Sequence, residues 1–317
     1  MSLPDSLKNL RLPLIGAPLF LIAQPDLVIA QCKAGIVGAF PALNARPPEL
    51  LDEWLTKITS ELEQAKEQNP SLPIAPFAVN QIVHSSNDRL LHDVQLCVKH
   101  KVPIVITSLR PPGEVVEAVH SYGGLVFHDV ISVKHAQKAI EMGVDGLILV
   151  CAGAGGHAGL MSPFSLITEV REFWDGPIIL SGAMSKGEHI LAALAMGADM
   201  AYMGTRFIAS QEAVASETYK QSLVKSHASD IIYTNFFTGV HGNYLRSSIE
   251  SAGLDPDNLP EGELKTMNFS GTTAKAWRDI WGAGQSVSGI KSIESVQNIV
   301  DKLYLEFTQA KSKIQLI

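Results

Sequence analysis

Short apolar runs rich in β-branched residues recur along the first two thirds of the chain. They span residues 12–18, 35–41, 74–80, 103–108, 125–130, 146–151, 177–182 and 200–205. Within each run the hydrophobic positions are nearly continuous and do not alternate with polar ones. That pattern is typical of parallel strands covered on both faces, whereas half-exposed antiparallel strands alternate. The pattern therefore predicts eight parallel strands.

Amphipathic segments lie between these runs and predict helices. Clear examples cover residues 48–68, 114–122, 132–142 and 186–196. Several predicted helices end at a glycine just before the next strand; these are Gly35, Gly123, Gly143 and Gly197. Glycine commonly ends a helix because it adopts the left-handed conformation at little cost. Helix and strand thus alternate regularly up to residue 205.

Eight strand–helix units predict an α/β fold, a (β/α)8 TIM barrel. The competing architecture is a doubly wound open sheet. Such a sheet normally has a glycine-rich phosphate turn after its first strand, but residues 15–20 (Ile-Gly-Ala-Pro-Leu-Phe) lack the G-x-G-x-x-G spacing. The barrel is therefore the favoured prediction.

After residue 205 the alternation stops. A helical stretch (212–226), a polar aromatic stretch (233–245) and a segment rich in Pro, Gly and Asp (253–263) follow, and residues 290–310 again have helical periodicity. We predict that residues 1–205 and 286–317 form the barrel. Residues 206–285 are predicted to form a mostly helical insertion over its active face.

Composition narrows the classes of partner. The formal net charge is −7 and no basic stripe is present, so nothing points to nucleic acid or an anionic membrane. We find no signal peptide and no apolar stretch near the ~20 residues needed to span a bilayer. The three cysteines have no metal-type or disulfide spacing, and the histidines have no metal-ligand spacing. We expect a cytoplasmic protein without a metal.

The predicted strand ends carry the candidate chemistry, because the active face of such a barrel lies at the carboxyl ends of its strands. Ser181-Gly182 follows the seventh strand and Gly204-Thr205 follows the eighth. These two loops often bind a phosphate through backbone N–H groups. The alternative is that both are ordinary turns.

A glycine-rich loop with one histidine follows the sixth strand. His157 stands among Gly153, Gly155, Gly156 and Gly159. Glycines allow a ligand to approach the backbone closely, and a histidine titrates near neutral pH and can move protons. The pattern predicts a ligand against the main chain with a base beside it, and the alternative is a flexible turn with a surface histidine.

Other residues leave their roles open. His128 and Asp129 close the fifth strand, where they could contact a ligand or where Asp129 could cap the helix that begins near Ser132. His241 lies in the insertion as a candidate substrate contact or a lid residue. Cys151 is interpreted as a small buried residue, since no thiolate-stabilising partner is adjacent in sequence.

Six motifs, in order along the chain, resemble the nitronate monooxygenase family, formerly called 2-nitropropane dioxygenase. They are Ala17-Pro18, the Phe-Ala-Val-Asn ending at Asn80, the Ala-Gly-Gly-His-Ala-Gly around His157, Ser181-Gly182-Ala183, the Met-Gly-Thr-Arg-Phe from Met203, and the Trp-Gly-Ala-Gly-Gln ending at Gln285. Members of that family are FMN-dependent TIM-barrel flavoproteins. Related FMN-dependent enoyl-carrier-protein reductases and NADH:quinone reductases share much of the pattern.

The resemblance implies particular roles. His157 matches the active-site histidine that takes a proton from the carbon bearing the nitro group. Asn80 matches an asparagine against the flavin, and the turn from Met203 matches part of the phosphate site. The cofactor-binding residues implied in this way are Ala17, Pro18, Asn80, Gly155, Gly156, Ser181, Gly182, Ala183, Met203, Gly204, Thr205 and Gln285.

The chain also departs from the family pattern. Many members have Gln or Glu where this chain has Val150, an acidic residue where it has Gly153, and Gly-Gly where it has Ser181-Gly182. The expected activity is the oxidation of a nitronate or nitroalkane by oxygen with FMN, in a monomer or homodimer. Two alternatives are an FMN-dependent NAD(P)H reductase of a quinone or enoyl thioester, and a catalytically silent flavin- or phosphate-binding barrel.

Overall fold

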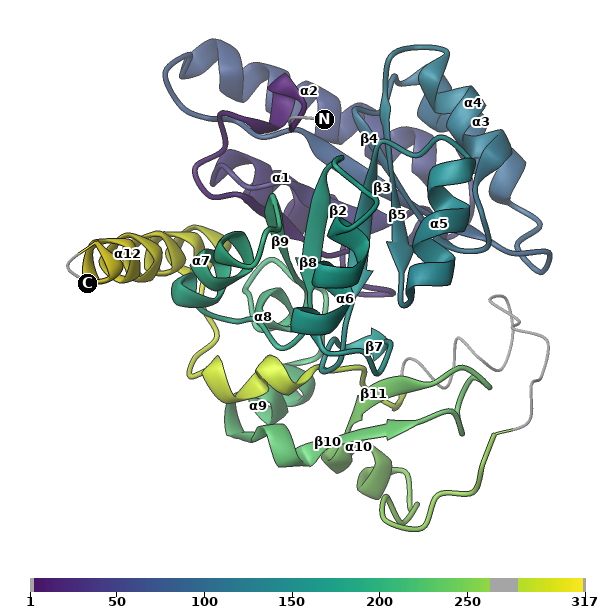
Figure 1. Ribbon diagram of the computed structural model, residues 1–317, viewed down its shortest axis with the longest axis vertical. Coiled ribbons are helices and arrows are strands. Elements are labelled where there is room, and N and C mark those ends of the chain that lie inside the picture. Colours follow the sequence, from purple (N-terminus) through teal and green to yellow (C-terminus); the bar gives the residue numbers. More distant parts are fainter. Residues whose placement is uncertain (1–2, 263–278, 316–317) are drawn as a thin grey trace.

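The computed structural model describes residues 3–262 and 279–315 and contains a closed eight-stranded parallel barrel surrounded by helices (Figure 1). The predicted (β/α)8 fold is therefore confirmed. The barrel strands are β1 (Leu14–Gly16), β2 (Gly38–Pro41), β3 (Phe77–Val83), β4 (Ile104–Leu109), β5 (Leu125–Val130), β6 (Gly146–Val150), β8 (Ile178–Ser181) and β9 (Met200–Met203). Each overlaps one predicted run, and the ends differ by up to three residues.

Neighbouring strands pair in parallel in the order β1-β9-β8-β6-β5-β4-β3-β2. The two outer members of this order also meet. Ile15 bridges Val37, the N–H of Gly16 donates to the carbonyl of Val37 at 2.8 Å, and the N–H of Val37 donates to Leu14 at 3.1 Å. These bonds close the sheet on itself, which excludes the doubly wound alternative.

Helices cover the outside of the barrel. They are α1 (Pro25–Lys33), α2 (Leu50–Gln68), α3 (Leu90–Lys99), α4 (Gly113–His120), α5 (Val133–Glu141), α6 (Pro163–Arg171), α7 (Gly187–Ala195) and α12 (Val296–Ile314). The four glycines predicted to end helices all have positive φ angles, between 81° and 101°. The glycine prediction is confirmed.

Helix α12 supplies the eighth outer helix, although it comes about 90 residues after β9 in the chain. It packs against α7 and α1, and it buries one face made of Val296, Ile299, Val300 and Leu303. This i, i+3, i+4, i+7 spacing is the apolar stripe of a helix that faces a core. Residues 290–310 were predicted to contain this closing helix; it begins six residues later and extends to Ile314.

Side chains alternate between the two faces of each strand, and this alternation sets the composition of the barrel interior. In β6, Ile148 and Val150 point inward, whereas Leu147 and Leu149 pack against the outer helices. Leu7, on the short helix η1 (Asp5–Leu7), packs into the same inner cluster. The interior is therefore a packed core and not a pore.

The segment between β9 and α12 holds short helices and a small sheet. Its described elements are α8 (Thr205–Ile208), α9 (Glu217–Lys225), η3 (Ala228–Asp230), β10 (Ile231–Thr234), β11 (Gly242–Leu245), α10 (Arg246–Ser251) and η4 (Gln285–Gly289). The helical stretch at 212–226 is confirmed as α9, while the polar aromatic stretch forms β10 and β11. Residues 263–278 of the predicted insertion lie outside the described residues.

The small sheet joins the insertion to the barrel. Its order is β10-β11-β7, in which β7 (Gly156–His157) belongs to the glycine-rich loop after β6. His157 pairs with Gly242 in antiparallel fashion. The loop that carries the candidate base is thus held in a strand pairing (Figure 1). No helix in the described ranges 3–262 and 279–315 has the length and apolar character of a membrane span.

Candidate functional site

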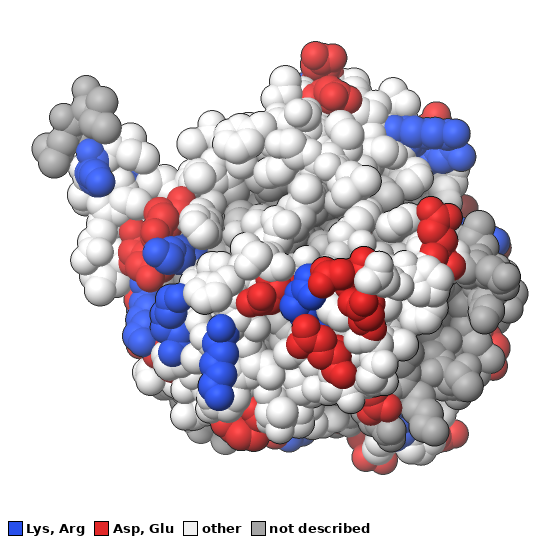
Figure 2. All heavy atoms as spheres, turned by 90° about the horizontal axis from the view of Figure 1, so that it is seen from below, with Lys and Arg blue, Asp and Glu red and all other residues white. Residues whose placement is uncertain are grey.

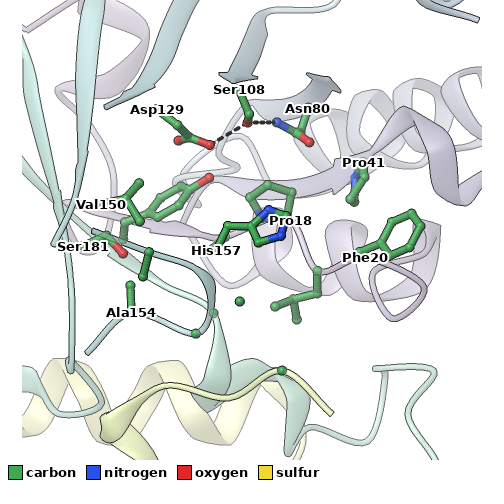
Figure 3. A pocket seen from close by; sticks show the side chains of 18 of the residues that line it. Pro18, Phe20, Pro41, Asn80, Ser108, Asp129, Val150, Ala154, His157 and Ser181 are labelled. Atoms are coloured by element: carbon green, nitrogen blue, oxygen red, sulfur yellow. Dashed lines mark hydrogen bonds between the residues drawn. The ribbon is translucent and has the colours of Figure 1, made fainter. Parts of the chain in front are cut away.

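A pocket of about 350 Å³ opens at the carboxyl ends of the barrel strands. This volume lies within the range of about 300–1,000 Å³ that is usual for small-molecule and cofactor sites. The inward-facing side chain at the end of every barrel strand contributes to its lining (Figure 3). In strand order these residues are Ala17, Pro41, Asn80, Ser108, Asp129, Val150, Ser181 and Tyr202.

Nine of the predicted site residues line this pocket. They are Ala17, Pro18, Asn80, Gly155, Gly156, His157, Ser181, Gly204 and Thr205. They come from the ends of β1, β3, β6, β8 and β9, so segments far apart in the sequence meet here. The motif positions were therefore a good guide to which loops converge.

Four predicted residues lie outside the pocket lining. Met203 is 1% exposed and packs between the sheet and the outer helices, because it has the opposite strand parity to Tyr202. Gly182 and Ala183 follow Ser181 in the turn after β8, with φ angles of 135° and 52°. Gln285 is exposed, and its N–H donates to the carbonyl of Gly153 at 2.9 Å.

His157 points its imidazole into the pocket from β7 (Figure 3). Its Nε2 lies 3.0 Å from Oγ1 of Thr238, and that hydroxyl donates its proton to the carbonyl of Val240 at 2.9 Å. Since the hydroxyl has only one proton, Nε2 of His157 donates and Thr238 accepts. In the neutral ring Nδ1 is then the unprotonated nitrogen. Burial lowers the pKa of His157 to about 4, so the ring is neutral at physiological pH.

A chain of hydrogen bonds crosses the pocket floor opposite His157 (Figure 3). The amide of Asn80 donates to Oγ of Ser108 at 2.8 Å, and Ser108 donates to Oδ2 of Asp129 at 2.6 Å. Burial raises the pKa of Asp129 to about 7. Oδ1 of Asp129 and the hydroxyl of Tyr202 are both buried without a hydrogen-bond partner among the described residues. Buried polar atoms of this kind usually serve a ligand or an ordered water.

The structure resolves the open roles of His128 and Asp129. His128 is buried on the outer face of β5, and its Nδ1 lies 2.8 Å from the hydroxyl of Thr107. That position is structural. Asp129 does not cap α5, because the N–H of His135 donates to the side chain of Ser132. The capping interpretation of Asp129 is wrong: strand parity turns this residue inward, away from the helix.

Two further candidates are also placed. The ring of His241 lines the mouth of the pocket and stacks on Tyr233, with centroids 5.1 Å apart. Cys151 is fully buried, and desolvation raises its thiol pKa to about 12, so it is not a nucleophile at neutral pH. The interpretation of Cys151 as a small buried residue agrees with this placement.

Charged groups are sparse around the site. No lysine or arginine occurs among the described residues that line the pocket. On the face that carries α9 and α10, acidic and basic side chains are intermixed, and the surface is hollowed between uncharged residues (Figure 2). Within residues 3–262 and 279–315 no group of three or more His, Cys, Asp or Glu side chains could hold a metal ion. An anion in the pocket would thus be bound by dipoles and not by a side-chain cation.

The insertion and the glycine-rich loop make close main-chain contact. A Cβ on Gly155 would lie 2.8 Å from the backbone nitrogen of Gly284 and 3.0 Å from Oγ1 of Thr205. The N–H of Gly284 donates to that same Oγ1 at 3.0 Å, and the amide of Asn243 donates to the carbonyl of Ala154 at 2.6 Å. Only glycine fits at position 155, so the loop is held rigidly beside the start of α8.

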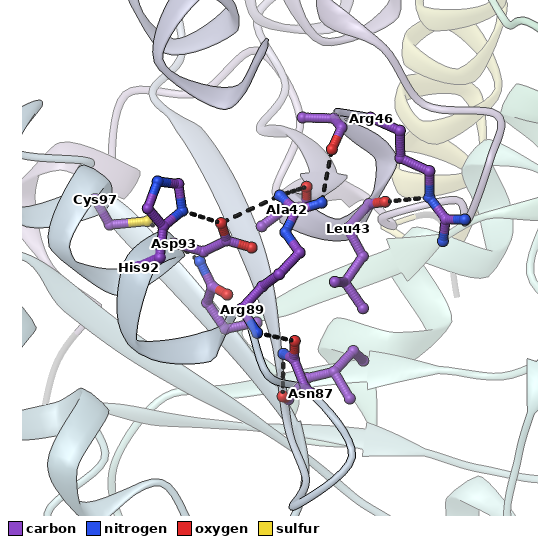
Figure 4. A network of polar contacts seen from close by, with 11 residues as sticks. Ala42, Leu43, Arg46, Asn87, Arg89, His92, Asp93 and Cys97 are labelled. Carbon is purple, nitrogen blue, oxygen red and sulfur yellow. Dashed lines mark hydrogen bonds and ion pairs between the residues drawn. The ribbon is translucent and has the colours of Figure 1, made fainter. Parts of the chain in front are cut away.

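A buried polar network supports the opposite wall (Figure 4). The guanidinium of Arg89 donates to the carbonyls of Ala45 at 2.7 Å and Ala42 at 3.3 Å, and it pairs with the fully buried Asp93 at 3.1 Å. These carbonyls belong to the turn that follows β2 and supplies Leu43 to the pocket. The network therefore fixes the position of that wall.

We expect Arg89→Met to destabilise the fold by about 3 kcal/mol, because the buried carboxylate of Asp93 then loses the guanidinium and keeps only the contact with the half-exposed ring of His92 at 3.0 Å. The free energy of unfolding in urea measures this loss. Lys57→Met is the matched control, since the Lys57–Asp26 pair is 52% and 72% exposed and should contribute under about 1 kcal/mol. Equal losses in the two variants would contradict the assigned role of Arg89.

We expect Thr238→Val to preserve the fold and to lower turnover about tenfold, a loss that corresponds to one hydrogen bond to His157 of about 1.4 kcal/mol. Valine has nearly the shape of threonine but cannot accept the proton of Nε2. Nitrogen NMR of the imidazole gives an independent readout. The wild type should show the Nε2–H tautomer, and a predominant Nδ1–H form in the wild type would refute this hydrogen-bond assignment.

The fold and the pocket define the class of protein: a (β/α)8 barrel with a small-molecule site at the carboxyl ends of its strands. The model of the family described as "Nitronate monooxygenase" matches residues 42–306. The chain belongs to this family and is an oxidoreductase.

Individual relatives are distant. The chain is 27% identical to a nitronate monooxygenase of Neurospora crassa, with 95% of this chain and 90% of the relative covered. It is 25% identical to a (3aS,4S,5R,7aS)-5-hydroxy-7a-methyl-1-oxo-octahydro-1H-indene-4-carboxyl-CoA dehydrogenase of Rhodococcus jostii, with 84% and 72% covered.

Solved structures with the same fold include a mutant of FabK from Thermotoga maritima, at 25% identity and a TM-score of 0.77, with 98% of this chain and 97% of that chain covered. A nitroalkane oxidase from Streptomyces ansochromogenes has 21% identity and a TM-score of 0.79, with 98% and 100% covered. At 21% identity, the second likeness concerns the fold alone.

Proposed function

We propose that this protein oxidises alkyl nitronates such as propionate 3-nitronate, or the nitroalkanes from which nitronates form. FMN would be the cofactor and oxygen the co-substrate. The observation that carries the proposal is the state of His157. It is a neutral imidazole that lies in the pocket and is oriented by the hydrogen bond between its Nε2 and Thr238. Membership of the nitronate monooxygenase family supports the same activity.

The residues present fit a flavin. The pocket lining is largely apolar, which suits the flavin ring, and Gly155, Gly156 and Gly204 have no side chain to fill the space beside it. Because no lysine or arginine of the described lining is available, the phosphate would be held by main-chain N–H groups at Gly204 and Thr205, with Ser181 beside them. Ala17, Pro18, Asn80 and Gly156 would border the ring. When bound, FMN supplies the redox chemistry with the substrate and with oxygen.

The protein itself removes the proton and positions the substrate. A neutral nitroalkane must lose a proton from the carbon that bears the nitro group, and the imidazole of His157 accepts it. The bond between carbon and hydrogen breaks, and its electron pair moves onto the nitro oxygens. A base with a pKa of about 4 stays unprotonated across the physiological range.

Anaerobic mixing of the FMN-loaded protein with an alkyl nitronate tests the proposal. Bleaching of the flavin absorbance within the turnover time is the expected result. A flavin that stays oxidised with nitronates but is bleached by NADH would overturn it and would favour the second candidate.

The second candidate is an FMN-dependent NAD(P)H reductase of a quinone or an enoyl thioester. It draws support from the likeness to FabK and from the relative of Rhodococcus jostii, whose name describes a dehydrogenase of an indene-carboxyl-CoA. A third possibility, a catalytically silent barrel, requires a colourless protein that takes up no FMN. Sedimentation of the FMN-loaded protein separates a monomer from a homodimer, the two states that we expect.

A further inference from the structure

We propose that Tyr202 and Asp129 form an oxyanion-binding pair, which donates hydrogen bonds to the substrate oxygen that gains negative charge as His157 removes the proton. This inference rests on the proposed function and adds the group that recognises the substrate. It selects carbon acids whose acidic C–H stands next to a nitro group or a comparable oxygen-bearing acceptor.

Tyr202 is the first member of the pair. It lies on β9 with its side chain turned into the barrel, and it is 7% exposed. The residue lines the pocket, and its buried hydroxyl has no hydrogen-bond partner among the described residues. A buried hydroxyl without a partner costs about 1–3 kcal/mol, so the arrangement is explained by an acceptor that arrives with the ligand. Burial, together with the nearby charge of Asp129, raises the pKa of Tyr202, which keeps it a donor.

Asp129 is the second member. One carboxyl oxygen accepts from Ser108 at 2.6 Å, which fixes the plane of the group. The other oxygen, Oδ1, is buried and has no partner among the described residues. The hydroxyl of Ser108 is itself held by the amide of Asn80 at 2.8 Å. The polar chain thus orients the free edge of the carboxyl group, and below its pKa that edge carries a proton to donate.

Two opposed protonation states are needed, and the pocket supplies both. Burial holds His157 neutral, as a base, and holds Asp129 protonated up to a pKa of about 7, as a donor. Two titratable groups whose surroundings shift their pKa values in opposite directions indicate the acid and the base of a site. A tyrosine beside a protonated carboxylic acid is an established oxyanion-binding arrangement. No proton is transferred to the substrate oxygen; the pair only stabilises its charge.

The surroundings of Asp129 do not supply a competing cation. The other titratable side chains that line the pocket are His135 on α5, His157 on β7, His241 in the insertion and Tyr219 on α9. His128 lies next along β5 but on the outer face. Lysine, arginine and glutamate are absent from the described lining. The charge state of Asp129 therefore decides whether an anion is attracted or repelled.

Butyrate is a suitable probe because it has the size, the charge and the planar two-oxygen head of the nitronate of 1-nitropropane, and it is not turned over. Its dissociation constant is measured by calorimetry on the FMN-loaded protein at about pH 6 and about pH 8.5, on either side of the Asp129 pKa, where butyrate itself stays ionised. We expect the wild type to bind butyrate about tenfold more weakly at the higher pH.

Three variants separate the contributions. Asp129→Asn keeps a neutral donor at every pH, so we expect it to bind butyrate with the affinity of the wild type at low pH and without pH dependence. Asp129→Ala should bind weakly at both pH values. Tyr202→Phe should bind about tenfold more weakly and lose about 100-fold in kcat with nitroalkanes, as when one oxyanion donor is removed. Tyr304→Phe, on the outer surface of α12, is the control and should match the wild type.

The FMN dissociation constant of each variant, from quenching of flavin fluorescence, identifies the group that the pair binds. Unchanged FMN affinity with weakened butyrate binding supports the proposal. The proposal is overturned if Tyr202→Phe and Asp129→Ala bind butyrate with wild-type affinity. It is also overturned if these variants lose as much affinity for FMN as for butyrate, or if the wild type does not bind butyrate. Butyrate binding requires no turnover. The binding experiment therefore still tests the oxyanion pair if the protein turns out not to oxidise nitronates.

Discussion

Replacing His157 by alanine should lower kcat/KM for neutral nitroethane about 1,000-fold, within the range of about 10²–10⁴ that a general base contributes. The variant should still bind FMN, because the phosphate is proposed to be held at Gly204 and Thr205, whereas the imidazole of His157 bonds to Thr238 in the insertion. With preformed ethyl nitronate the loss should be under about tenfold, since no proton then has to be removed. Oxygen uptake with each substrate form measures the two values.

The diagnostic quantity is the ratio of the two activities. His241→Ala serves as a matched control, because His241 lines the same pocket but stacks on Tyr233 at its mouth. That variant should keep the wild-type ratio of nitroethane to nitronate activity. If His157→Ala loses kcat/KM equally with nitroethane and with ethyl nitronate, His157 is not the base.

The second large effect concerns the cofactor. Gly204→Trp should abolish FMN binding, because position 204 lines the pocket at the end of β9, where the phosphate is proposed to lie. Its φ angle of −104° is accessible to any residue, so the substitution introduces bulk without backbone strain. The flavin content of the purified protein, and its recovery on adding FMN, measures the effect.

Gly204→Ala distinguishes bulk in the pocket from damage to the fold. A Cβ at position 204 would lie 3.2 Å from Leu19 and 3.4 Å from Ala17, both flexible or small side chains. We expect the alanine variant to fold and to keep FMN. Full FMN occupancy in Gly204→Trp would place the phosphate elsewhere.

Strand and helix positions followed from the sequence because burial on both faces imposes a simple pattern. Runs such as the one in β6 are continuous in apolar residues since one half of their side chains fills the barrel and the other half faces the helices. The ends were less predictable. The first run was predicted to start two residues before β1, but Pro13 has no N–H for a strand ladder.

The small sheet could not be predicted in the same way. Its strands β10 and β11 are short and partly polar, and β7 comprises only Gly156 and His157. The pairing that holds His157 joins residues about 85 apart in the sequence, and no local pattern records such a contact. The partner of the base, Thr238, was missed for this reason.

The side chains of the pocket floor could partly have been predicted from the sequence. Strand parity alone turns Asn80, Ser108, Asp129 and Tyr202 inward, because each stands an even number of residues from an inward apolar side chain. Applying parity to the eighth strand would have selected Tyr202 in place of Met203. Met203 belongs to the motif that resembles the family's phosphate turn, but its side chain packs on the outer face of the strand.

The departures from the family pattern can be interpreted physically. Val150, which stands where the family pattern described above has Gln or Glu, is apolar and lines the pocket. Among the described residues of this lining, the polar atoms without a partner are instead on Asp129, in the neighbouring strand β5, and on Tyr202 in β9. A changed arrangement of donors within one fold is the expected route to a changed substrate preference.

A crystal structure of the protein with FMN tests the central claim most directly. The account predicts the FMN phosphate against the main-chain N–H groups of Gly204 and Thr205 and the flavin ring beside Ala17, Pro18, Asn80 and Gly156. It also predicts space for the substrate between the imidazole of His157 and the side chains of Asp129 and Tyr202. A phosphate bound away from the ends of β8 and β9, or an imidazole turned out of the pocket in the FMN complex, would contradict it.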